Sequence, residues 1–198
     1  MTLSTLIYII ILLISVVLHE LAHGYTADAL GDPTPRMEGR LSFNPLVHLD
    51  WFGSVLLPAL MIITGLPFVF GWAKPVPFNP YRLRNQRWGS AMVAASGPLV
   101  NITLAVLMSL LLSIVDSGTL ISQILQLGIL TNVVLAVFNL VPIPPLDGHH
   151  ILFALLPESL NGFKQQLRSI SWPLVFVFIL FGFQLIEPVI NYFYRLLV

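Results

Sequence analysis

Residues 15–26 read Ser-Val-Val-Leu-His-Glu-Leu-Ala-His-Gly-Tyr-Thr and lie within a longer apolar segment. His19 and His23 are four positions apart, so on an α-helix both imidazoles lie on one face and can bind a single ion. Glu20 lies beside them, where it can take a proton from a metal-bound water. Ionisable groups are costly at membrane depth and mark functional sites there. The stretch therefore predicts a catalytic zinc site on a membrane helix rather than a chance match to a short pattern.

The composition of the whole chain is typical of a membrane protein. Its 198 residues are 57% hydrophobic and 9% charged, against about 25% charged residues in a soluble domain. Nine basic residues balance nine acidic ones, so the charge does not indicate a nucleic-acid partner. The absence of cysteine excludes a thiolate metal site. We expect one membrane-embedded domain over 1–198, whose apolar N-terminus is a retained helix because no basic n-region precedes it.

Four apolar segments reach the length of about 20 residues that a membrane-spanning helix needs. They lie at 3–30, 88–115, 120–141 and 170–190. The stretch 51–70 is also apolar, but glycines and prolines at positions 53, 58, 65 and 67 interrupt it. We therefore expect an all-α polytopic membrane protein with about four transmembrane helices.

The basic residues indicate that 51–70 is a re-entrant segment. If the first helix runs from outside to inside, Arg36 and Arg40 are cytoplasmic, and the positive-inside rule places the basic group at 74–87 on the same side. Both flanks of 51–70 are then cytoplasmic, and only Arg195 of the nine basic residues lies outside. Five full crossings remain the alternative.

This orientation also sets the depth of the zinc motif. His19 lies about 24 Å along a helix that starts near Leu3. That depth corresponds to the cytoplasmic part of a hydrocarbon core about 30 Å thick. We therefore expect the active site to open toward the cytoplasm.

A catalytic zinc takes three protein ligands and a water, so a third ligand is needed. Asp147 is the best candidate, because Pro142-Ile-Pro-Pro145 ends the preceding apolar segment, and irregular backbone at membrane depth is tolerated where it lines a cavity. Gly148 permits a sharp turn that lets the carboxylate face inward. The alternative is that Asp147 is the N-cap of a helix at 148–156; a cap and a ligand could also coexist.

Three motifs in chain order resemble those of the site-2 protease family of intramembrane zinc metalloproteases, peptidase family M50. They are His19-Glu-Leu-Ala-His23, Ala95-Ser-Gly-Pro-Leu-Val-Asn101 and Asn139-Leu-Val-Pro-Ile-Pro-Pro-Leu-Asp147-Gly148. The resemblance implies one Zn²⁺ per chain, held by His19, His23 and Asp147, with Glu20 as the general base. It implies a minimal catalytic core without PDZ or CBS domains, a site that opens to the cytoplasm, and transmembrane segments of other membrane proteins as substrates.

Other residues of these motifs are candidates for contact with the substrate or the oxyanion. The resemblance implies that Asn139 helps to hold the substrate, and a neutral amide suits pairing with an unwound backbone. Gly97 would permit close approach to the zinc helix. Asn101, four positions on, could orient water or the oxyanion, or only form an interhelical hydrogen bond. We count Pro142 among the same candidates.

The roles of three further histidines and of one proline-rich segment stay open. His149 and His150 follow Asp147-Gly148 where many family members have a second glycine. We expect them, like His48, to be interfacial, with a metal ligand or a hydrogen-bond partner of a ligand as the alternative. Residues 71–80 contain too many prolines for a helix or a central strand. They predict a short extended cytoplasmic segment that is a linker or pairs with a substrate strand.

The sequence thus predicts an intramembrane zinc endopeptidase in the membrane of a prokaryotic cell, acting in regulated intramembrane proteolysis. The competing class is a non-proteolytic membrane protein that uses zinc structurally or handles metal ions. Glu20 discriminates between the two, because a structural site is closed by four protein ligands and needs no free carboxylate beside a water.

Overall fold

The computed structural model describes residues 3–65 and 71–198, and within these ranges it is helical without a β-strand. Four helical runs are long and apolar enough to cross a membrane: α1 (Leu3–Ala29), α4 (Gln86–Leu112), α5 (Leu120–Asn139) and Ser171–Leu197. The last run consists of α8 (Ser171–Val177), the π-helical turn η5 (Phe178–Gly182) and α9 (Phe183–Leu197). The predicted all-α polytopic architecture is confirmed.

Shorter helices connect these long ones. They are α2 (Thr34–Met37), η1 (Pro45–His48), η2 (Trp51–Leu56), α3 (Leu57–Ile63), η3 (Pro80–Arg82), α6 (Gly148–Leu155), η4 (Glu158–Leu160) and α7 (Asn161–Ser169).

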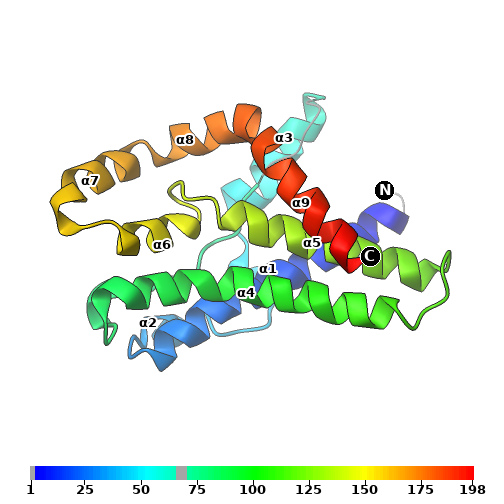
Figure 1. The fold of residues 1–198 in the computed structure, drawn as a ribbon, viewed down its shortest axis with the longest axis horizontal. Helices are drawn as coiled ribbons and strands as arrows, with labels where there is room; N and C mark the ends of the chain where they lie inside the picture. Colours follow the sequence, from blue (N-terminus) through cyan, green and yellow to red (C-terminus); the bar gives the residue numbers. More distant parts are fainter. Residues whose placement is uncertain (1–2, 66–70) are drawn as a thin grey trace.

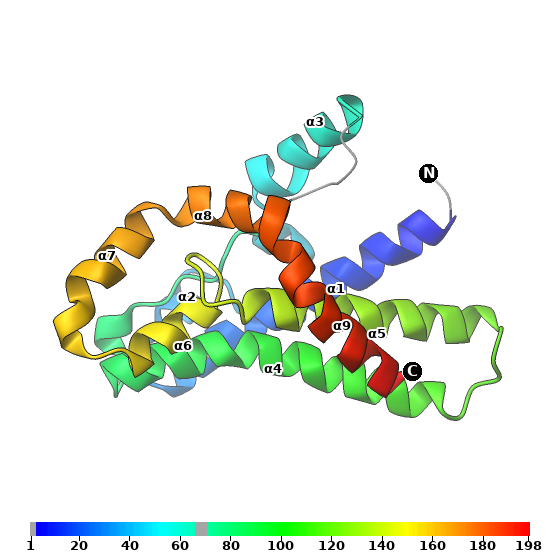
Figure 2. The same ribbon diagram turned by 45° about the horizontal axis from the view of Figure 1, so that its top comes forward.

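The elements η2 and α3 form one apolar helix that is too short to cross a bilayer. They have 6 and 7 residues, which together extend about 20 Å, whereas the hydrocarbon core is about 30 Å thick. Figure 2 shows α3 projecting away from the other helices. This length supports re-entry over a fifth crossing, although 66–70, the end of the predicted segment 51–70, lie outside the described residues.

The bundle that holds the site consists of α1, α4 and α5, and α4 contacts both of the others. The helices α4 and α5 run side by side in Figures 1 and 2, joined by the hairpin 113–119. Ala105, Ile129, Val133 and Ile190 pack between α4, α5 and α9. A second apolar cluster joins the loop after α5 to α8 and η5, and thereby fixes the stretch that carries Asp147.

The bundle has two opposite ends (Figure 1). The hairpin 113–119 and the C-terminus lie at one end, and α2, the start of α4 and α7 lie at the other (Figure 1). A side chain caps the N-terminus of a long helix at each end of the bundle. Asn85 accepts from the Trp88 amide at 3.0 Å at the start of α4, and Thr119 accepts from the Ser122 amide at 3.1 Å at the start of α5. These caps define where α4 and α5 begin.

Candidate metal centre and active-site cleft

The donor atoms of His19, His23 and Asp147 lie within 4.8 Å of one another. Both histidines project from one face of α1, as their spacing predicts. Nε2 of His19 is 3.1 Å from Oδ2 of Asp147, and Nε2 of His23 is 3.3 Å from Oδ1. Two imidazole nitrogens and a carboxylate form a donor set typical of catalytic zinc.

The arrangement of these three side chains fits the binding of a shared cation better than hydrogen bonding among themselves. The two Nε2 atoms face each other at 3.1 Å, and Oδ2 of Asp147 is buried without a hydrogen-bond partner. A cation among them would satisfy all of these lone pairs, whereas unpaired buried polar atoms cost free energy. Asp147 precedes α6 but makes no side-chain cap hydrogen bond, so the N-cap alternative does not account for its carboxylate.

Each imidazole is held from behind by a hydrogen bond at Nδ1. Nδ1 of His23 donates to the Val93 carbonyl at 2.7 Å, and Nδ1 of His19 lies 2.6 Å from Oδ1 of Asn101. With the proton on Nδ1, a neutral ring has its lone pair on Nε2, the nitrogen that faces Asp147. Such partners orient metal-binding histidines and fix their tautomer.

Gly97 allows α4 to approach the two histidines. A Cβ at this position would lie 2.6 Å from Nε2 of His19 and 2.6 Å from Cε1 of His23. Carbon atoms in ordinary contact are about 3.5–4.0 Å from their neighbours. Residue 97 thus lies too close to both imidazole rings to carry a side chain.

Glu20 lines the same cleft as the three donors. The cleft has a volume of ≈ 410 Å³ and is bounded by α1, α4, the end of α5, residues 71–78 and α8. Oε2 of Glu20 accepts a hydrogen bond from the Val76 amide at 2.8 Å. Pro75 and Pro77 have no N–H, so Val76 supplies the amide proton of this Pro-Val-Pro stretch. The contact holds the Glu20 carboxylate beside the donor cluster.

Residues 71–79 are extended, as predicted, and one edge of this segment is already paired. The Trp72 amide donates to the Gly53 carbonyl at 3.2 Å, and the Lys74 amide donates to the His48 carbonyl at 2.8 Å. A substrate strand could therefore add only at the opposite edge. The ring of Trp72 contacts that of Trp172 at 4.9 Å between centroids, so the segment meets α8 beside the cleft.

Of the other predicted site residues, Asn139 lines the cleft, whereas Asn101 and Pro142 do not. Asn139 lines the cleft, while its Nδ2 donates to the Leu135 carbonyl at 2.9 Å. Asn101 is fully buried and does not line the cleft, so the structure favours its interhelical hydrogen bonds over contact with an oxyanion. Pro142 is exposed, and the structure does not bring it to the cleft.

Of the three further histidines, His150 alone lines the cleft. His149 is buried, and its Nδ1 donates to the Leu146 carbonyl at 2.6 Å. His48 is buried before η2, with Nε2 donating to the Ser42 carbonyl at 2.8 Å. None of the three joins the donor cluster found among the described residues.

Two residues outside the three motifs join the site through Asn101. Nδ2 of Asn101 donates to Oδ1 of Asn132 at 2.8 Å, and Nδ2 of Asn132 donates to Oγ of Ser15 at 3.0 Å. Sequence reasoning missed both residues. The sequence signal that could have identified them is a polar residue within an apolar membrane segment.

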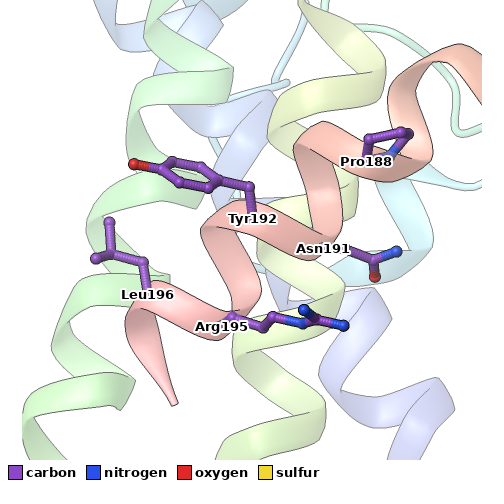
Figure 3. Close-up of a pocket in the computed structure, with 5 residues that line it drawn as sticks. All are labelled: Pro188, Asn191, Tyr192, Arg195 and Leu196. Carbon is purple, nitrogen blue, oxygen red and sulfur yellow. The ribbon is translucent and has the colours of Figure 1, made fainter.

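A second hollow, on α9, shows no such convergence of polar groups. It is lined by Pro188, Asn191, Tyr192, Arg195 and Leu196. In Figure 3, Asn191 and Arg195 point to one side of the helix, and Tyr192 and Leu196 point to the other. No histidine or carboxylate among the described residues lines this hollow, so it is not a candidate for a metal centre.

Comparisons with known proteins agree with the geometry of the cleft. The chain matches the family model described as peptidase family M50 over residues 7–120 and 113–182. It is 34% identical to YwhC of Bacillus subtilis in an alignment 201 positions long, which covers 96% of the chain and 88% of YwhC. It is 33% identical to Rip2 of Mycolicibacterium smegmatis over 184 residues, which cover 90% of the chain and 66% of Rip2.

A third relative is archaeal. MJ0611 of Methanocaldococcus jannaschii is 30% identical over 103 residues, which cover 52% of each protein. The names of all three relatives describe them as candidate zinc metalloproteases. No solved structure matches the chain with statistical significance.

Proposed function

Because the chain belongs to peptidase family M50, we propose that it is an intramembrane zinc endopeptidase that cleaves transmembrane segments of other membrane proteins. It is a zinc metalloprotease with four apolar helices long enough to span a membrane. The proposal adds the substrate class, one Zn²⁺ per chain held by His19, His23 and Asp147, and Glu20 as the base. Its relatives in bacteria and an archaeon support a prokaryotic cell as its source, and its four apolar helices support the cell membrane as its location. Regulated intramembrane proteolysis is the role that the proposal assigns to it.

The observation that carries the proposal is that the three donors and Glu20 share one cleft within a bundle of membrane helices. His19 lies about 24 Å along α1, so a segment that reaches the cleft must do so at membrane depth. Three donors meet among the described residues, whereas a structural zinc site is closed by four. The arrangement therefore favours a protease over a protein that uses zinc only structurally.

The residues of the cleft have distinct roles in the proposed reaction. When bound by His19, His23 and Asp147, zinc supplies Lewis-acid polarisation of the scissile carbonyl and lowers the pKa of water. Glu20, held by the Val76 amide, takes a proton from the attacking water and passes it to the departing amine. Asn139 lines the same cleft and can hydrogen-bond to substrate backbone that has left its helix.

The cleft opens to the cytoplasm in this proposal. Arg36 and Arg40 follow α1, and Arg82, Arg84 and Arg87 lie around the start of α4. These elements share one end of the bundle with α7, which carries two further basic residues (Figure 1). The positive-inside rule assigns that end to the cytoplasm, so water reaches Glu20 and the donors from there.

Substitution of Glu20 tests the proposal. The purified protein is reconstituted with zinc and a panel of single-pass helices, and the products are identified by mass spectrometry. Glu20→Gln keeps an oxygen for the Val76 amide but cannot take up a proton. We therefore expect cleavage to fall by about 10²–10⁴-fold while the zinc content stays at one ion per chain.

Two matched variants complete this experiment. Glu158→Gln changes an exposed glutamate on η4 and should leave cleavage unchanged. Asp147→Asn should lower the zinc content and cleavage together, because a neutral amide is a poor zinc ligand. Full activity of Glu20→Gln would exclude the proposed base, and unchanged zinc content in Asp147→Asn would remove Asp147 from the ligand set.

A further inference from the structure

A chain of buried polar side chains connects α1, α4 and α5 behind the metal centre. It runs from Nδ1 of His19 through Asn101 and Asn132 to Ser15, with donor–acceptor distances of 2.6, 2.8 and 3.0 Å. Asn101 and Asn132 are 0% exposed, and Ser15 is 1% exposed. Asn101, Asn132 and Ser15 do not line the cleft, so they act on the site through His19 and not by contact with the substrate.

Backbone carbonyls fix the direction of every bond in this chain. Nδ2 of Asn132 lies 2.9 Å from the carbonyl oxygen of Gly128, which can only accept. The amide nitrogen of Asn132 must therefore face Gly128, and its oxygen must face Asn101. Asn101 presents its NH₂ group to that oxygen, and the same group lies 3.4 Å from the carbonyl oxygen of Ser15, a second obligate acceptor.

The consequence appears at His19. Since the NH₂ group of Asn101 faces Asn132, its Oδ1 faces the imidazole and can only accept a hydrogen bond. Nδ1 of His19 must therefore carry a proton, which leaves Nε2 of the neutral ring as the metal-binding atom. We call this chain of hydrogen bonds from Ser15 through Asn132 and Asn101 to His19 the relay. His23 needs no relay, because the Val93 carbonyl accepts from its Nδ1 directly.

We propose that Asn132 and Ser15 are positioning residues that, through Asn101, fix the tautomer and orientation of His19 for zinc binding. This inference rests on the proposed function in taking His19 as a zinc ligand. Partners of metal-binding histidines typically change metal affinity by 10–100-fold when they are removed. Asn132 acts one hydrogen bond farther from the metal than Asn101, so its removal should weaken zinc binding by about 10-fold, at the low end of that range.

The test measures zinc affinity by competition with a chromogenic chelator in detergent solution, and needs no substrate. Asn132→Leu removes the hydrogen bonds of the relay, while the leucine side chain is similar in size to that of asparagine. Thr131→Val is the matched control: Thr131 is the adjacent buried residue of α5, and its hydroxyl donates to the Leu127 carbonyl of the same helix. We expect about 10-fold weaker binding for Asn132→Leu, no change for Thr131→Val, and a smaller loss for Ser15→Ala, because Asn132 keeps its bond to Gly128.

A double-mutant cycle separates positioning from a general loss of fold. Asn101→Leu cuts the relay next to His19, so adding Asn132→Leu in that background should not weaken zinc binding further. A purely structural effect of Asn132 would weaken binding in both backgrounds alike. Thermal unfolding of each zinc-free variant shows whether it is folded, and if Asn132→Leu is not, Asn132→Ala takes its place in the cycle.

Each result decides one question. Equal zinc affinity of Asn132→Leu and the unsubstituted protein, or additive losses in the cycle, would overturn the relay. If His19→Ala leaves zinc binding unchanged, the proposed metal centre itself is wrong. If His19→Ala abolishes binding while Asn132→Leu does not affect it, only the relay is wrong.

Discussion

Gly97 lies against both histidines of the metal centre, where even a methyl group would overlap their rings. Within a helix, glycine is less favourable than alanine by about 1 kcal/mol, so the propensity of α4 alone would favour alanine. The contact between α4 and α1 nevertheless requires glycine, because the imidazoles can occupy their positions only if residue 97 lacks a side chain. At the residue scale, the site thus depends on an absent Cβ as well as on the donor groups.

We expect Gly97→Ala to lose function while keeping the fold. The added Cβ must displace His19 and His23, and a displacement of about 1 Å can lower activity by about 10²-fold. Zinc affinity and cleavage should both fall, while helix content by circular dichroism stays unchanged. Gly162→Ala on α7 is the control, because a Cβ there meets nothing within 4 Å. Wild-type zinc affinity in Gly97→Ala would contradict this account.

The extended segment that borders the cleft is held against α1 by two carboxylates. Glu20 accepts from the Val76 amide, and Asp32, just after α1, accepts from the amides of Asn79 and Thr34. Burial by itself would raise the pKa of Asp32. The hydrogen bonds from Thr34 and Asn79, with Arg82 nearby, outweigh it and hold the pKa of this carboxyl below its ordinary value. At the element scale, Asp32 thereby anchors the end of the segment.

We expect Asp32→Ala to lower the free energy of unfolding by about 1–3 kcal/mol near pH 7, because it leaves two partly buried amides without their acceptor. Since folding lowers the Asp32 pKa, its carboxylate stabilises the fold above the unfolded-state pKa of about 4. That contribution is lost as the pH falls through the folded-state pKa. Thermal unfolding of both proteins should therefore differ at pH 7 and converge in acid.

The control for this prediction is Asp28→Ala. Asp28 pairs with the exposed Arg36, and such surface pairs contribute about 0–1 kcal/mol. A loss for Asp28→Ala as large as that for Asp32→Ala, or a difference that persists in strong acid, would show that Asp32 does not anchor the segment through its charge.

The whole molecule has two ends of different character. The hairpin 113–119 and Arg195 lie at one end, whereas the loops that carry the other basic residues connect the opposite ends of the four long helices. In the proposed orientation, η2 and α3 return to the side of the membrane from which they start. Orientation and re-entry are therefore one question at this scale, and a single labelling experiment addresses both.

Because the chain has no cysteine, single substitutions can be labelled with a membrane-impermeant maleimide in intact cells. Ser117→Cys, in the hairpin between α4 and α5, should react from outside. Gly162→Cys, on α7, should react only after permeabilisation. Thr64→Cys, directly after α3, should be protected from outside if the segment re-enters. Labelling of Thr64→Cys in intact cells would instead support five crossings.

The sequence by itself determined the four long helices and indicated the principal donors. Hydropathy is a local property, so the segment predicted at 88–115 matches Gln86–Leu112, and that at 120–141 matches Leu120–Asn139. The spacing of His19 and His23 fixes their shared face within one helix. Asp147 could be chosen because few carboxylates lie next to a break in an apolar segment.

Only the tertiary structure decided what supports these donors. Asn132 reaches Ser15 across 117 positions, and Glu20 reaches the Val76 amide across 56. A local pattern does not specify which distant group an amide or a carboxylate meets, because helix packing sets that distance. For the same reason the sequence left Asn101 open between an oxyanion contact and an interhelical hydrogen bond, and its complete burial between α1 and α5 favoured the hydrogen bond.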